Sequence, residues 1–170
     1  MKADILFSEH QRFKQWWFLM FPIGINILLL IGVFYQIIGG KQFGDKPMSN
    51  EELVITTGIS ILFTILLLNF RLDTQIKNDG IYVRFFPFHL RYKFYPWEEL
   101  TKCYVRQYSP IAEYGGWGLR YGFFGKGKAY NVSGNKGLQL EFKNNKKLLI
   151  GTNKQEELNQ ILYKTEKYME

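Results

Sequence analysis

Hydrophobic and polar positions divide the chain into two parts with different patterns. Two stretches, 15–40 and 53–70, contain no charged residue. About 20 apolar residues cross the hydrocarbon core of a bilayer as a helix, and about 17 are the lower limit. The pattern therefore predicts membrane-spanning helices at about 16–38 and 53–70, joined by a short loop over 41–52. Core helices of a soluble protein are the alternative, which suits the second stretch better because it contains several Thr and Ser residues.

After Arg71 the pattern changes to an alternation of apolar and polar residues, which is typical of strands with one buried face. A tight turn is expected at Asn78-Asp79-Gly80, because these residue types tolerate positive φ. Thr152 and Asn153 are good N-caps for a final amphipathic helix. We therefore predict a membrane hairpin over 1–70, followed by an α+β, mainly β domain over 71–170. The predicted strands cover 72–77, 81–85, 91–95, 100–107, 138–142 and 147–151, and the apolar stripe of the final helix is Leu158, Ile161, Leu162 and Met169.

Charge follows the same division. The chain has a formal net charge of +7. Its mean hydropathy of −0.17 is an average over the two parts, 1–70 and 71–170, and describes neither of them. Basic and acidic residues balance over 1–70, so the whole excess lies in 71–170. Basic residues near the helix ends favour both termini in the cytoplasm and an external loop. An anionic inner leaflet is the simplest partner for this charge, and nucleic acid fits a membrane-tethered domain poorly.

Polar and small residues within the two stretches predict how the helices pack. We expect Asn26 to form a hydrogen bond across the hairpin, because an amide in hydrocarbon needs a partner. Small residues at four-residue spacing let helices approach closely. Packing within the hairpin is the simpler interpretation. The same face is also suited to a homo-oligomer, or to docking the chain as an accessory subunit of a larger membrane complex. The residues of this predicted packing set are Gly24, Asn26, Gly32, Thr56, Ser60 and Thr64.

The order of the predicted elements over 71–170 resembles the pleckstrin-homology-like (PH-like) fold, a barrel of about seven antiparallel strands closed by a C-terminal helix. A two-helix anchor before such a module is similar to small bacterial membrane proteins of a family without an assigned activity. The resemblance implies the bacterial cytoplasmic membrane as location, and binding of lipids or peptides. The segments that support it are 78–82 (NDGIY), 95–100 (YPWEEL), 114–120 (YGGWGLR) and 149–152 (LIGT).

Two sets of residues are candidates for binding. The segment 114–130 contains six glycines among aromatic and basic residues. It is either a structural loop with Trp117 and Tyr121 in the core, or an exposed tip that touches headgroups or a partner chain. The candidate lipid or partner surface is Trp117, Arg120, Phe123, Phe124, Lys126 and Lys128. The second set, a basic hairpin cluster, is Lys77, Arg84, Arg91 and Lys93.

Chemistry-bearing residues are few. Cys103 alternates in phase with a predicted strand, so we expect an inert cysteine. The stretch Gly122–Lys128 matches part of a phosphate-binding loop, but Ala129 replaces the required Ser or Thr and no helix follows. We expect no catalytic residue, no metal and no cofactor. The sequence thus predicts a non-enzymatic membrane protein that presents a module for protein, peptide or anionic-lipid binding. A lipid-modifying enzyme is the weaker alternative, because no acid, base or metal constellation is found.

Overall fold

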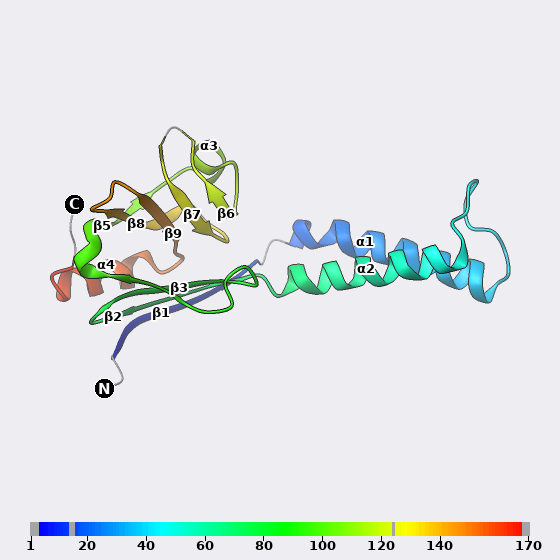
Figure 1. Cartoon of the computed structure of the whole chain (residues 1–170), viewed down its shortest axis with the longest axis horizontal. Coiled ribbons are helices and arrows are strands. Elements are labelled where there is room, and N and C mark those ends of the chain that lie inside the picture. The colour runs from blue at the N-terminus through cyan, green and yellow to red at the C-terminus, as the bar shows by residue number, and fades with distance from the viewer. Residues whose placement is uncertain (1–3, 14–15, 124, 168–170) are drawn as a thin grey trace. The chain divides into compact units, whose positions relative to one another are not determined.

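The computed structural model describes residues 4–13, 16–123 and 125–167, and it forms two compact units (Figure 1). Lys14–Asn69 is a helical unit, called here the helix pair. Met1–Phe13 and Phe70–Glu170 together form the sheet unit, which holds two β-sheets and a C-terminal helix. The helix pair is therefore an insertion within the sequence of the sheet unit.

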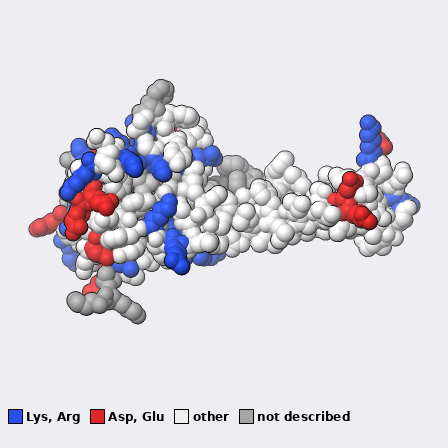
Figure 2. All heavy atoms as spheres, viewed as in Figure 1, with Lys and Arg blue, Asp and Glu red and all other residues white. Residues whose placement is uncertain are grey.

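The helix pair consists of α1 (Trp16–Val33), its continuation as a short π-helix η1 (Phe34–Ile38), and α2 (Asn50–Leu68). Leu19–Ile38 and Asn50–Leu68, of 20 and 19 residues, are long and apolar enough to cross a membrane by length and composition. Only 17% and 22% of these spans are buried within the chain. On the face of the helix pair that Figure 2 shows, charged residues appear only at the end with the connecting loop.

The second helix begins three residues earlier than the sequence analysis predicted, because Ser49 caps it. The Ser49 hydroxyl accepts a hydrogen bond from the Glu52 amide at 3.2 Å, and the Glu52 carboxylate accepts one from the Ser49 amide at 2.9 Å. This reciprocal capping box satisfies two backbone donors that the first turn leaves free. Glu51 and Glu52 thus belong to the first turn of α2, where the helix dipole favours negative charge.

The two helices meet along a seam that includes the predicted hydrogen bond. The Asn26 amide donates to the Thr64 hydroxyl at 2.7 Å, as expected for an amide between apolar helices. The buried residues of α2 are Leu53, Thr57, Thr64 and Leu67, with Ser60 half-buried between them. Their three- and four-residue spacing is that of a coiled-coil seam.

Three residues of the predicted packing set lie elsewhere. Thr56 is exposed, because each four-residue step turns about 40° around the helix and so leaves the seam. Gly24 faces open space, and Gly32 meets the ring of Phe43 in the connecting loop. The glycines therefore make no notch for α2.

The sheet unit is a sandwich of two open sheets, which lie as two layers in Figure 1. The first has the order β1-β2-β3-β4, and the second has the order β5-β8-β9-β7-β6. Nine strands occur in the described part of the chain rather than about seven, and they do not close into a barrel. Strands β7 and β9 pair in parallel, and the other pairs are antiparallel. The strands are β1 (Ile5–Arg12), β2 (Arg71–Lys77), β3 (Gly80–Phe86), β4 (Lys93–Pro96), β5 (Leu100–Gln107), β6 (Gly118–Tyr121), β7 (Lys128–Asn131), β8 (Lys136–Phe142) and β9 (Lys147–Gly151).

The core lies between the sheets, and α4 (Gln155–Lys164) covers part of it with Leu158 and Leu162. The predicted amphipathic helix is confirmed, but its predicted N-cap is wrong. The helix begins at Gln155 with Lys154 at the cap position and no side-chain cap. The predicted contribution of Met169 lies outside the described residues.

Strand β1 was not predicted, because the sequence analysis assigned 1–70 to the hairpin. It pairs with β2 so that Arg12 and Arg71 are Cα partners, although the whole helix pair separates them in sequence. Glu9 and Gln11 point inward, where apolar residues would have revealed a strand. The Glu9 carboxylate accepts hydrogen bonds from the Thr152 hydroxyl at 2.6 Å and from the Asn153 amide at 2.8 Å. Thr152 and Asn153 therefore anchor β1 instead of capping α4.

We expect Glu9→Gln to destabilise the sheet unit. Glu9 is 4% exposed, and a glutamine amide would place hydrogen-bond donors opposite the donors that the carboxylate accepts. Leaving a buried polar group unsatisfied costs about 1–3 kcal/mol. Thermal unfolding of the full chain in detergent micelles should show a lower midpoint. The exposed-site control Glu98→Gln should unfold like the wild type, and equal midpoints for both variants would refute this role of Glu9.

Candidate functional site

A cavity of about 620 Å³ lies in the sheet unit at the β4 edge of the first sheet. Its other walls are the segment from the end of β6 to β7 and the turn between β8 and β9. Four lysines line it, and Glu99 is the one acidic residue among the described lining residues. Its volume is within the range of small-molecule sites, which is about 300–1,000 Å³.

The alternation of side chains along β4 and β7 places Lys93 and Lys128 on the faces that line the cavity. Lys93 is the Cα partner of the buried Val83, and therefore lies on the inner face of the first sheet. Lys128 is two residues before the buried Tyr130, so both side chains lie on one face of β7. The cavity is thus lined by strand residues of both sheets.

Gly127 allows the third wall to come close. It has a φ of +81°, and a Cβ at this position would collide with the backbone carbonyl of Lys147. The contact lies just before the parallel pairing of Lys128 with Leu148. A glycine here lets the segment that precedes β7 pass directly over the start of β9, which brings Lys128 beside the β8–β9 turn.

Three of the four lysines lack an acidic partner. Lys147 pairs with Glu141 at 3.3 Å, but no carboxylate of the described residues lies within 4.0 Å of Lys93, Lys128 or Lys146. The Lys93 ammonium contacts the Tyr130 hydroxyl at 3.4 Å. Among the described residues, no ion pair therefore neutralises the charge of these three lysines.

Nearby groups respond to this positive charge. Lys128 lies over the ring of Tyr121, 5.1 Å from its centroid. The His89 ring packs on Tyr130, with centroids 5.2 Å apart. Burial lowers the pKa of His89 below its ordinary value, and the charges of Lys93 and Lys128 lower it further. The lysine charges that disfavour protonation of His89 would attract an anion in the cavity.

The segment 114–130 is not a plain loop, and its ends are buried whereas the described residues of its middle are exposed or half-buried. It contains β6 and the start of β7, and Tyr121 is 75% exposed, which contradicts the interpretation that places it in the core. Trp117 is half-buried, with its indole N–H donating to the Gly134 carbonyl at 3.1 Å. Phe123 is 52% exposed. Phe124 lies outside the described residues.

The cations of the predicted surface point to different places. Lys128 lines the cavity, and Lys126 lies 3.9 Å from Glu113. The Arg120 guanidinium donates to the Trp117 carbonyl at 2.9 Å. The structure therefore assigns one of these three cations to the cavity.

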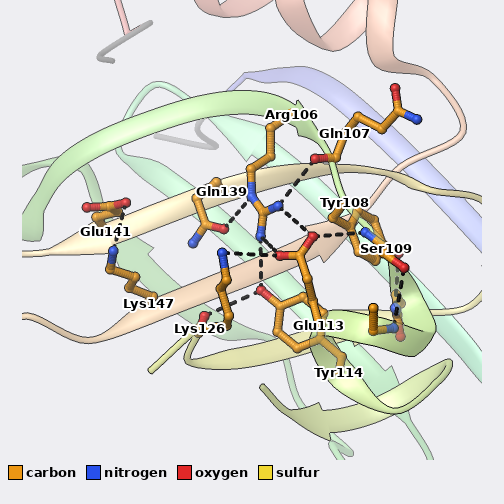
Figure 3. A network of polar contacts seen from close by, with 12 residues as sticks. Arg106, Gln107, Tyr108, Ser109, Glu113, Tyr114, Lys126, Gln139, Glu141 and Lys147 are labelled. Carbon is orange, nitrogen blue, oxygen red and sulfur yellow. Dashed lines mark hydrogen bonds and ion pairs between the residues drawn. The ribbon is translucent and has the colours of Figure 1, made fainter. Parts of the chain in front are cut away.

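Glu113 is the centre of a polar network that holds the glycine-rich segment (Figure 3). It lies in the short helix α3 (Pro110–Tyr114), and its carboxylate accepts from the Arg106 guanidinium at 2.8 Å and from the Ser109 amide at 2.9 Å. The Glu113 carbonyl accepts from the Phe123 amide at 2.9 Å. Although partial burial opposes ionisation, the hydrogen bonds and charge of Arg106 lower the pKa of Glu113. The network fixes α3 and the β6–β7 connection beside the cavity.

The predicted basic hairpin cluster does not form. Lys93 faces the cavity, whereas Arg84, next to its partner Val83, lies on the opposite face of the first sheet. The Arg84 guanidinium donates twice to Asp73, at 2.6 and 2.9 Å. Lys77 lies over the ring of Tyr82, and Arg91 is exposed. Arg84 is thus neutralised within its own sheet.

The sequence analysis missed most of the cavity. The stretch Lys143-Asn144-Asn145-Lys146-Lys147, where the predicted strands 138–142 and 147–151 are joined, was not considered as a binding site, although three lysines in five residues are a signal for an anion site. Tyr95 and Tyr130 were not recognised as a shared wall, because their elements are far apart in sequence. Cys103 is fully buried, and burial raises the pKa of its thiol to about 12, in accord with the inert strand cysteine that was expected.

Comparison with protein-family models, with curated proteins and with solved structures finds no match for this chain.

The Asp73 network predicts how stability depends on pH. Partial burial acts to raise the pKa of Asp73, but hydrogen bonds from His10 and Arg84 and the charges of Arg84 and Arg71 hold it below the ordinary value of 3.8. The resulting stabilisation is complete above the ordinary value and is lost as the pH falls through the lower folded-state pKa. Asp73→Asn should therefore flatten the acid side of a plot of unfolding midpoint against pH. Identical slopes for the two proteins would contradict this expectation.

Proposed function

We propose that this chain is a two-pass membrane protein that holds a non-enzymatic binding module, the sheet unit, at the membrane surface. The observation that supports the membrane anchor is the exposure of the helix pair: its two helices are long enough to span a membrane and leave most of their apolar side chains exposed. A core helix of a soluble protein would be mostly buried. Apolar surfaces much larger than a few hundred Å² mark membrane or protein interaction sites.

The lipid bilayer is the proposed occupant of this surface because the exposed residues surround both helices. Exposed Phe21, Leu28 and Ile31 on α1 and Ile59, Leu62 and Phe63 on α2 belong to this surface. No Asp, Glu, Lys, Arg or His interrupts Leu19–Ile38. The Asn26 side-chain N–H group donates to the Thr64 hydroxyl, which donates to the Ser60 carbonyl, and such polar contacts between helices suit a hydrocarbon surrounding.

Strand pairing constrains the topology of such a protein. Because Arg12 and Arg71 are Cα partners, the chain that leaves the sheet unit at β1 must return to it at β2. Two crossings satisfy this requirement. With a sheet unit of net positive charge and the bias of basic residues, we propose that both termini face the cytoplasm and that the connecting loop is external.

The sheet unit is the proposed binding module. Two sheets with a C-terminal helix are compatible with the resemblance to PH-like modules, which bind lipids or peptides. Protein, peptide and anionic lipid are the proposed partner classes. The lysine-lined cavity supports an anionic ligand, because an unpaired ammonium group gains from a negative partner.

A second role, as an accessory subunit of a larger membrane complex, is favoured by small residues on the outer faces of the helices. A Cβ added at Gly24 or Gly58 would meet no atom beyond the local helix backbone within 4 Å, and Thr56 is exposed. Small outward residues allow another helix to approach closely. Crosslinking in the native membrane from a photoreactive residue at Gly58 would support this role by yielding one specific adduct, and lipid adducts alone would refute it.

Cysteine labelling tests the anchor and its topology together. A membrane-impermeant maleimide should label Asp45→Cys, in the connecting loop, in intact cells. It should label Lys164→Cys, on α4, only after the cells are opened. Native Cys103 serves as the internal background, because it is fully buried with a raised thiol pKa.

Two outcomes would contradict the proposal. Release of the chain by alkaline carbonate washing would refute the membrane-spanning anchor. Labelling of Asp45→Cys only after the cells are opened would refute the external loop.

A further inference from the structure

We propose that the cavity between β4, the β6–β7 segment and the β8–β9 turn binds a phosphate monoester carried on an apolar group. This inference rests on the proposed binding role of the sheet unit and names the ligand class of its cavity. Lys93, Lys128 and Lys146 supply the charge, and aromatic side chains supply the apolar wall.

The charge of the site indicates a compact anion of high charge. Three lysines without an acidic partner within 4.0 Å among the described residues face one cavity. A phosphate monoester carries about −1.5 to −2 charges at neutral pH and has three acceptor oxygens, one for each ammonium group. A single negative charge would leave most of this positive charge unbalanced.

The choice of side chain distinguishes phosphate from carboxylate. All four basic residues that line the cavity are lysines, and no arginine lines it among the described residues. Arginine forms a planar fork that matches a carboxylate with two parallel hydrogen bonds, whereas lysine acts as a point charge. Lysines from three separate elements, β4, β7 and the β8–β9 turn, suit the tetrahedral oxygens of a phosphate better than a flat group.

The apolar part of the ligand follows from the remaining wall. Tyr95 and Phe142 pack with ring centroids 5.5 Å apart, and both line the cavity together with Tyr130. Burial, followed by the neighbouring Tyr130, raises the pKa of the Tyr95 hydroxyl, so Tyr95 stays neutral beside the lysines. A ring or an acyl glycerol group can pack on these faces while the phosphate meets the ammonium groups.

Two sources supply this chemistry. One is a membrane lipid with a phosphate monoester headgroup, such as phosphatidic acid, and the other is a soluble phosphate ester. Both place the same group on the same lysines, so the binding experiment needs one arm for each source.

The test uses the full chain in phosphatidylcholine nanodiscs and isothermal titration calorimetry with phenyl phosphate. We expect saturable binding, with weaker binding of inorganic phosphate, which lacks the ring, and of phenyl sulfate, which has one charge. Lys93→Gln and Lys128→Gln should each weaken phenyl phosphate binding about five- to tenfold, as the loss of one charge-assisted hydrogen bond predicts. The matched control is Lys102→Gln, which removes the same charge from an exposed site away from the cavity and should bind like the wild type.

The source is assigned by adding phosphatidic acid to the nanodiscs. If phosphatidic acid competes with phenyl phosphate in the wild type but not in Lys128→Gln, the ligand is the lipid headgroup. If phosphatidic acid leaves phenyl phosphate binding unchanged, the ligand is a soluble ester. Failure of the wild type to bind phenyl phosphate saturably at millimolar concentration would overturn the inference. Equal affinities for Lys93→Gln, Lys128→Gln and Lys102→Gln, with unchanged thermal unfolding, would overturn it as well. The membrane anchor is judged separately by cysteine labelling, so the two proposals fail independently.

Discussion

The pairing of β1 with β2 connects the two parts of the sheet unit that lie before and after the helix pair in sequence. It joins two strands between which the entire helix pair is inserted, so the loop that must be closed is long. The cost is offset by a continuous ladder from Phe7 to Arg12 and by buried polar contacts of the inward side chains Glu9 and Gln11. Glu9 reaches Thr152 and Asn153, and the Gln11 amide donates to the Gly151 carbonyl at 2.6 Å. The first strand is thereby fastened both to its neighbour and to the β9–α4 junction.

This pairing also decides what the helix pair can do. Because Arg12 and Arg71 are Cα partners, the segment between them must start and end at neighbouring positions of the first sheet. The two helices bring the chain back by packing against each other along the seam that contains Asn26 and Thr64. Their outer faces stay apolar, and the bilayer is the surrounding that we propose for them. In that proposal, the membrane anchor is joined to the sheet unit through the end of β1 and the start of β2.

The cavity depends on a second long-range arrangement. Lys93, Lys128 and Lys146 come from three elements, and no two of them are neighbours in sequence. Parallel pairing of β7 with β9, which Gly127 permits, brings two of the elements together. The Glu113–Arg106 ion pair holds the adjoining α3 and β6–β7 connection. Lys93 and Lys128 are thus presented by strands of the two sheets, and Lys146 by the β8–β9 turn.

The sequence alone predicted the two apolar helices, the period-two strands from Leu72 onward and the stripe of Leu158 and Leu162. These features depend on periodicities of a single segment, so they can be recognised without knowing its neighbours. It also predicted the Asn26 hydrogen bond, because an amide among apolar residues needs a partner nearby. The tertiary structure was needed to find β1, because its inward residues Glu9 and Gln11 are polar and their hydrogen-bond partners are at the other end of the chain. It likewise decided the cavity, since Lys93 and Arg84 look alike in sequence. One faces an open space and the other a carboxylate, because neighbouring positions on paired strands lie on opposite faces of a sheet.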